Sequence, residues 1–253
     1  MLISNVWTLD NFTSLYYNAT RTGFKISCSG SDSVIITVAN RKGGVGKTTT
    51  SVILAYISTT RGYKTVLVDM DRQKNAFDKV MLEDETQEGT FKPVFRNLDC
   101  IVADDRIPEH DELSQYDIAV VDTPPRADTR SIRGILAKSD AVVAPFLMSK
   151  DALGGIAELF DQLPADGRLV PFPLHLVSPM ETHFEKSLYE VAYSYFADYG
   201  IYKKDIIHWP MRKNIINNIG FYKPFYFGLM PKDKDIYFRT FDLIVRTIKE
   251  VRR

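Results

Sequence analysis

A glycine-rich segment enclosed between an apolar run and a helix-type stretch most constrains the fold of this chain. Residues 34–39 read VIITVA, a β-branched pattern that favours a buried parallel strand. Residues 41–49, RKGGVGKTT, follow directly, and 48–60 have helical character. Glycines let the backbone curl until several N–H groups point at one phosphate, and a helix N-terminus adds partial positive charge. The sequence therefore predicts a phosphate-binding loop between a strand and a helix.

The loop departs from the ordinary GxxxxGK[ST] spacing, because Arg41 stands where the first glycine would and a second lysine, Lys42, precedes the paired glycines. We expect Lys47 to bridge the β- and γ-phosphates and the Thr48 hydroxyl to bind Mg²⁺. A glycine-rich turn that binds nothing is the alternative, which the strand–loop–helix context disfavours. The expected phosphate contacts are Lys42, Gly43, Gly44, Val45, Gly46, Lys47, Thr48 and Thr49.

Carboxylates end two further apolar runs. Residues 65–69 end in Asp69, with Asp71 two positions later, and residues 118–122 end in Asp122. The carboxyl ends of parallel strands border the ligand crevice, and a strand that ends in Asp can deliver a carboxylate to the hydration sphere of Mg²⁺. A nearby carboxylate can also orient or deprotonate an attacking water. Alternatively, Asp69 and Asp71 only cap the start of a helix.

The same alternation of apolar strands and helices continues along the chain, which predicts an α/β fold of the P-loop NTPase class, a mainly parallel twisted sheet with helices on both faces. No linker-type composition interrupts it, so we expect one domain at 34–253 and an N-terminal extension at 1–33. The further strands are expected at 141–145 and 174–177, and the further helices at 151–163, 183–199 and 237–253.

Three motifs in this order resemble the ParA/MinD superfamily of ATPases. KGGVGKTT at 42–49 is similar to the deviant Walker A motif of that superfamily. DMDRQ at 69–73 resembles its switch I, although Arg72 stands where proline is frequent, and DTPP at 122–125 resembles its switch II. The resemblance runs from about residue 34 to the C-terminus and implies that the nucleotide is ATP with Mg²⁺.

The resemblance also implies roles for individual residues. Lys42 would reach across a nucleotide-sandwich homodimer to the phosphates of the partner, and Asp71 would act on the attacking water. Asp69 would lie near the Mg²⁺ ion together with Asp122. In the late loop, Pro210 and Met211 would flank the adenine.

Absent features narrow the choice within the superfamily. No cysteine occurs at 124–130, as the nitrogenase iron protein requires, and the C-terminal region lacks the CxxC of the iron–sulfur carriers. The 33 residues before the first strand are too few for a helix-turn-helix domain. The chain thus resembles small ParA-type partition ATPases, which implies a cytoplasmic, nucleoid-associated enzyme that binds DNA without sequence preference. A ParB-like centromere-binding protein would stimulate its ATP hydrolysis to segregate plasmid or chromosomal DNA.

The distribution of charge is compatible with a DNA partner. Residues 203–253 carry twelve Lys/Arg against five Asp/Glu, although the whole chain has a net charge of zero. Such a basic region can contact phosphates, and the alternative is a solvated basic surface without a partner. The candidate DNA contacts are Lys203, Lys204, Arg212, Lys213, Lys223 and Arg246.

Two other functions stay open. A MinD-like or cargo-positioning ATPase could act on a membrane or a protein assembly, since residues 237–253 mix basic and apolar side chains as a membrane-surface helix does. We favour a helix packed on the core, and no signal peptide or run of about 18 apolar residues occurs, so no membrane partner is expected. The third possibility is an ATP-using metabolic enzyme of the same fold.

Overall fold

The computed structural model describes residues 33–71, 75–80, 92–95, 97–103, 106–125, 128–164, 168–177, 186–211 and 231–252. All but the last residue of the expected N-terminal extension lies outside these ranges, so the division into extension and domain stays a prediction. Arg72 and three of the candidate DNA contacts, Arg212, Lys213 and Lys223, lie outside them as well.

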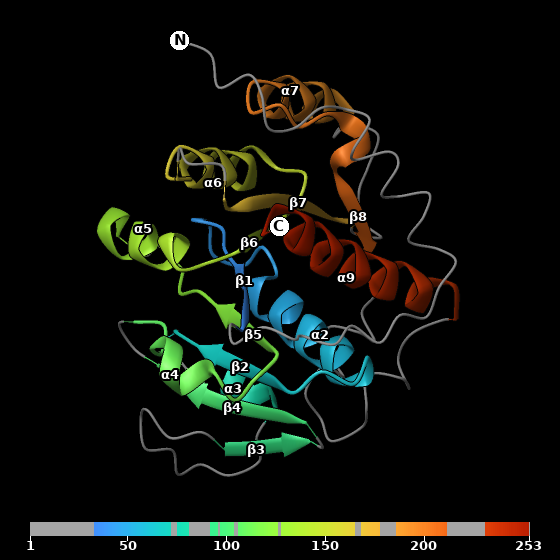
Figure 1. Cartoon of the computed structure of the whole chain (residues 1–253). Coiled ribbons are helices and arrows are strands. Elements are labelled where there is room, and N and C mark those ends of the chain that lie inside the picture. The colour runs from blue at the N-terminus through green and yellow to red at the C-terminus, as the bar shows by residue number, and fades with distance from the viewer. Residues whose placement is uncertain are drawn as a thin grey trace.

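The described strands form one sheet in the order β3-β4-β2-β5-β1-β6-β7-β8 (Figure 1). All neighbours pair in parallel except β3, which runs antiparallel to β4 at one edge. The expectation of a mainly parallel P-loop NTPase sheet is confirmed. The strands are β1 Val34–Val38, β2 Thr65–Asp69, β3 Lys92–Phe95, β4 Leu98–Val102, β5 Ile118–Asp122, β6 Ala141–Phe146, β7 Val170–Val177 and β8 Ile207–Pro210.

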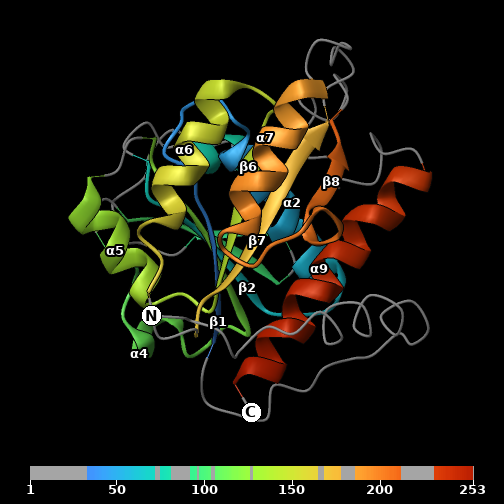
Figure 2. The same ribbon diagram turned by 90° about the horizontal axis from the view of Figure 1, so that it is seen from above.

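Helices cover both faces of the sheet, as Figures 1 and 2 show. On one face α2 packs over alternate side chains of β1, such as Ile36 and Val38, and α9 packs beside it over β7 and β8. On the other face α5, α6 and α7 pack over Val142 and Ala144 of β6. Burial on both faces explains why the strands are continuously apolar. The helices are α2 Lys47–Thr60, α3 Asn75–Val80, α4 His110–Leu113, α5 Thr129–Ala137, α6 Lys150–Phe160, α7 Lys186–Ala197 and α9 Pro231–Val251, with a 3₁₀ turn η2 at Lys203–Asp205.

Three strands, β3, β4 and β8, were not expected from the sequence, and β7 is longer than expected. The first half of β7 was not predicted because it contains Pro171 and Pro173, and proline has no N–H to donate to a neighbouring strand. That half pairs only with β6, since β8 joins β7 only from Leu174 onward. Both prolines therefore lie where one side of the strand has no neighbour among the described strands.

The last helix is packed on the core. It begins at Pro231, six residues before its expected start, and its apolar side chains Tyr237, Phe241 and Ile244 are buried. They contact α2 and β8, where Trp209 Nε1 donates to Thr240 Oγ1 over 3.0 Å. Of the helices that the structure describes, none combines the length and apolar character needed to cross a bilayer.

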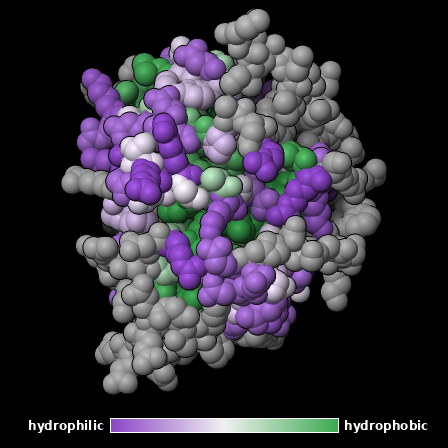
Figure 3. Space-filling model, turned by 60° about the vertical axis from the view of Figure 1, so that its left-hand side comes forward, coloured by the Kyte–Doolittle hydropathy of each residue, from purple (hydrophilic) through white to green (hydrophobic). Residues whose placement is uncertain are grey.

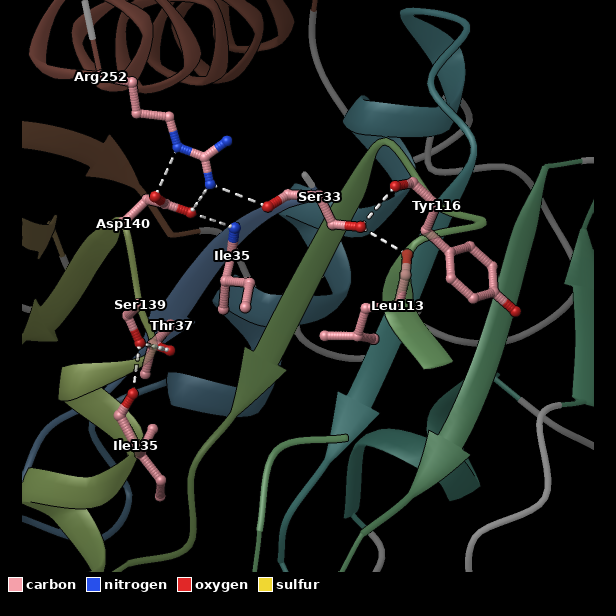
Figure 4. Close-up of polar contacts among 9 residues, drawn as sticks. All are labelled: Ser33, Ile35, Thr37, Leu113, Tyr116, Ile135, Ser139, Asp140 and Arg252. Atoms are coloured by element: carbon pink, nitrogen blue, oxygen red, sulfur yellow. Dashed lines mark hydrogen bonds and ion pairs between the residues drawn. The ribbon is translucent and has the colours of Figure 1, made fainter. Parts of the chain in front are cut away.

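A polar cluster ties the end of α9 to the start of β1 (Figure 4). The Arg252 guanidinium donates two hydrogen bonds of 2.7 Å to the carboxylate of Asp140 and one of 2.9 Å to the carbonyl of Ser33. Asp140 Oδ2 also accepts the backbone N–H of Ile35 at 2.7 Å. One carboxylate thus joins α9, β1 and the turn before β6.

Replacing this carboxylate should destabilise the fold. Asp140→Ala removes the carboxylate that pairs with Arg252 and leaves the N–H of Ile35 without this acceptor, so we expect the free energy of unfolding to fall by about 1–3 kcal/mol. Asp235→Ala is the control, because its pair with Arg239 is exposed and should contribute about 0.5 kcal/mol or less. Urea unfolding measures both variants, and equal losses would contradict a joining role for Asp140.

Candidate nucleotide-binding site

The glycine-rich loop connects β1 to α2 at the carboxyl edge of the sheet. The arrowheads of β2 and β4 point to the left in Figure 1, so Figure 3 views the molecule from that edge, where hydrophilic residues predominate and hydrophobic ones show between them. Gly44 and Gly46 have φ angles of 74° and 90°, which favour glycine. A Cβ at Gly46 would also lie 2.4 Å from Leu176 Cδ1 of β7. Val45, Lys47 and Thr49 are buried, Lys42, Gly43, Gly46 and Thr48 are half-buried, and Gly44 is exposed.

Lys47 points its ammonium group into the site. Its side chain is buried, and Nζ donates to the carbonyl of Lys42 at 3.1 Å. Burial lowers the pKa of Lys47, and the nearby carboxylates of Asp122 and Asp71 oppose that shift. A buried cation beside a loop of backbone N–H groups can neutralise a bound phosphate, and the phosphate contact of Lys47 stays a prediction.

Asp122 is fully buried, as is Asp69. Burial, followed by repulsion from Asp69, raises its pKa to about 7, while the hydroxyls of Thr48 and Ser51 and the charge of Lys47 act in the opposite direction. Ser51 Oγ donates to Asp122 Oδ1 over 2.9 Å. The other oxygen, Oδ2, is buried and has no hydrogen-bond partner among the described residues.

An orphaned carboxylate oxygen in the interior is costly unless a cation or donor approaches it. Mg²⁺ takes oxygen ligands and keeps several waters, so one carboxylate and one hydroxyl suit it. Asp122 and Thr48 supply these two groups in one place, and the residues present therefore fit the ion.

Asp69 and Asp71 differ in their surroundings. Asp69 Oδ1 accepts the N–H of Asp71 at 3.0 Å, and Oδ2 accepts the N–H groups of Ala76 and Phe77 at 2.8 Å each. Asp69 thus caps the start of α3, the alternative that the sequence left open, although it also lies beside Asp122 in register. Its expected place near Mg²⁺ stays a prediction, as does the action of Asp71 on water. The Asp71 side chain is 7% exposed and close enough to influence Lys47.

Helix α6 supports the first half of the loop, a contact that the sequence did not reveal. The Asn40 side chain accepts the N–H of Lys42 at 2.8 Å and donates to the carbonyl of Pro145 at 2.9 Å. A Cβ at Gly155 of α6 would lie 2.5 Å from Asn40 Oδ1 and 2.8 Å from Lys42 N. One turn earlier, Asp151 Oδ2 pairs with Lys42 Nζ at 3.0 Å.

The remaining candidate residues lie elsewhere. Pro210 is half-buried and ends β8, and Met211 is buried in the hydrophobic core, so their contact with adenine stays a prediction. Lys203 and Lys204 are exposed in η2, where Lys203 Nζ lies 5.1 Å from the centre of the Tyr193 ring. Arg246 is half-buried on α9.

Adjacent glycines of α6 offer a test of its contact with the loop. Gly155→Ala should displace Lys42, lower the free energy of unfolding by about 1–3 kcal/mol and weaken ATP binding, because its Cβ would overlap backbone. Gly154→Ala should retain ATP affinity and be neutral or stabilising, since its Cβ would meet nothing within 4 Å. Thermal unfolding and calorimetric titration with ATP measure both effects, and equal behaviour of the two variants would refute the contact.

Comparison with known proteins agrees with this geometry. Residues 33–111 match the family model described as an AAA domain. The chromosome-partitioning ATPase Soj of Thermus thermophilus is 30% identical over 151 residues, which cover 51% of this chain and 60% of Soj. The sporulation initiation inhibitor protein Soj of Bacillus subtilis is 30% identical over 161 residues, 50% of this chain and 63% of that relative. The chain therefore matches less than two thirds of the length of these relatives.

Solved structures share the fold over a larger part of the chain. MinD of Pyrococcus furiosus, a cell division ATPase, superposes with a TM-score of 0.65 at 15% identity and covers 85% of this chain and 99% of its own. The ATP complex of McdA from Cyanothece has a TM-score of 0.60 at 16% identity, with 88% and 97% covered. The segment that carries the two-lysine phosphate loop thus matches the AAA domain model, the chain is similar in sequence to Soj over about half its length, and its fold is similar to that of MinD.

Proposed function

We propose that this chain is a ParA-type partition ATPase, in which Mg-ATP drives a sandwich homodimer that binds DNA non-specifically. A ParB-like activator would stimulate hydrolysis, and the cycle would segregate or position plasmid or chromosomal DNA. The observation that carries the proposal is that the two lysines of the loop differ in burial and in contacts. Lys47 is buried beside Asp122, whereas the Lys42 side chain is 42% exposed and points to Asp151 on α6. Lys42 is thus accessible to a phosphate that a second copy presents.

Each group of the site then has one task. The N–H groups of the loop and Lys47 would bind the phosphates. Thr48 and Asp122 would hold Mg²⁺, which would neutralise charge on the phosphates. Asp71, tethered through its N–H to Asp69, orients the attacking water. Exclusion of bulk water by the second copy would strengthen these electrostatic contacts.

Two observations support DNA rather than a membrane as the binding partner: the exposed lysines of η2 and the packing of α9 on the core. Lys203 and Lys204 can contact phosphates without reading bases. In contrast, the apolar face of α9 already packs against α2 and β8, so this helix does not offer that face to a membrane. The partition function therefore has more support than the MinD-like alternative.

A pair of variants tests whether Lys42 acts on a partner. Lys42→Ala should weaken ATP-dependent dimerisation, because the phosphates would lose a cation contributed by the second copy. Asp151→Ala removes the same intramolecular ion pair but keeps the lysine, so its dimer should persist. Both substitutions are made in an Asp71→Ala chain, and light scattering in the presence of ATP measures the amount of dimer. Equal weakening of the dimer in the two variants would show that Lys42 serves only its pair with Asp151.

Fluorescence anisotropy of a random-sequence DNA duplex tests the proposed function directly. We expect binding in Mg-ATP, little in Mg-ADP, and a steep loss of affinity as salt rises, since phosphate contacts release counterions. Asp71→Ala should bind ATP, fail to hydrolyse it and remain on the DNA. Absence of DNA binding in both nucleotides would exclude the partition function while leaving the ATPase to be tested by phosphate release.

A further inference from the structure

Ser51 lies beside the carboxylate that is proposed to hold Mg²⁺, yet no motif of the phosphate loop includes it. It follows Thr48 by three positions in α2, so both hydroxyls lie on the same side of the helix. Helix α2 packs against β5, which ends in Asp122. The Ser51 side chain is fully buried, and so is Asp122.

The hydroxyl of Ser51 has two acceptors within reach. Oγ is 2.9 Å from Asp122 Oδ1 and 3.1 Å from the carbonyl oxygen of Lys47. A hydroxyl has one proton to donate, and a carboxylate accepts more strongly than a neutral carbonyl. The shorter distance and the stronger acceptor both favour donation to Asp122.

The hydrogen bond from Ser51 distinguishes the two oxygens of Asp122. Oδ1 is engaged by Ser51, while Oδ2 is buried and has no hydrogen-bond partner among the described residues. A carboxyl group held at one oxygen cannot rotate freely about its terminal bond. Its second oxygen is thereby presented in a fixed direction.

We propose that Ser51 is a positioning residue for Mg²⁺, which holds Asp122 so that Oδ2 faces the ion. This inference rests on the proposed function, because it assumes a Mg-nucleotide complex. Groups that orient a metal ligand affect metal affinity by about 10–100-fold when they are removed. Ser51 therefore contributes to Mg²⁺ affinity without touching the nucleotide.

The chain provides a matched control on the same helix. Ser58 is also fully buried in α2, and its hydroxyl bonds with Thr65 Oγ1 at 2.7 Å, away from Asp122. Ser58→Ala therefore removes a buried hydroxyl of α2 and should reproduce any general loss of stability. Ser51→Cys is a second test variant, because a thiol is similar in size but a weak donor.

The test separates Mg²⁺ binding from nucleotide binding with the fluorescent nucleotide mant-ADP. Its affinity is measured in excess EDTA, and Mg²⁺ is then titrated at a fixed mant-ADP concentration. We expect Ser51→Ala and Ser51→Cys to weaken apparent Mg²⁺ affinity by about tenfold or more, with mant-ADP affinity in EDTA changed less than about twofold. Ser58→Ala should change neither constant.

Unchanged Mg²⁺ affinity in both Ser51 variants would overturn the inference. An equal loss of Mg²⁺ affinity in Ser58→Ala would also overturn it, as would an equal loss of mant-ADP affinity in EDTA by the Ser51 variants. If Ser51→Ala fails to fold, as thermal unfolding would show, Ser51→Cys decides. The proposed function fails separately, namely if the wild-type chain binds no mant-ADP or if Mg²⁺ has no effect on that binding.

Discussion

The electrostatic balance around Asp122 is the constraint on which the site depends. The end of β5 places this carboxylate in the interior, where Thr48, Ser51 and Lys47 compensate part of its charge. One oxygen is left without a hydrogen-bond partner among the described residues. Such a group lowers the stability of the protein without a ligand and is stabilised by a bound cation. Asp122 therefore favours cation binding at a cost in folding stability.

Close backbone approach is the second requirement of the site. The loop can lie against α6 because Gly155 has no side chain, as the short distance to Lys42 N shows, while Gly46 meets the need for a positive φ beside β7. The contact between Gly155 and Lys42 lets α6 determine the position of Lys42. The pair of Lys42 with Asp151 is partly exposed, and such pairs contribute little to stability, so it can be broken readily when a phosphate competes.

Asp69 and Asp71 illustrate how two neighbouring carboxylates acquire different tasks. Asp69 is committed to three backbone N–H groups and fixes the turn into α3. This turn determines the position of Asp71, which lies near Lys47. The structural acid therefore positions the acid proposed to act in hydrolysis.

The sequence by itself determined the phosphate loop, the strands that end in Asp69 and Asp122, and the class of fold, because glycine spacing and apolar runs are local properties. Tertiary structure alone decided which atoms surround Asp122, since Ser51, Thr48 and Lys47 reach it only when α2 packs on β5. It also decided that Gly155 must be small and that Asp140 joins α9 to β1. These contacts connect residues about 70 to 115 positions apart, and no local pattern encodes a distance between such segments.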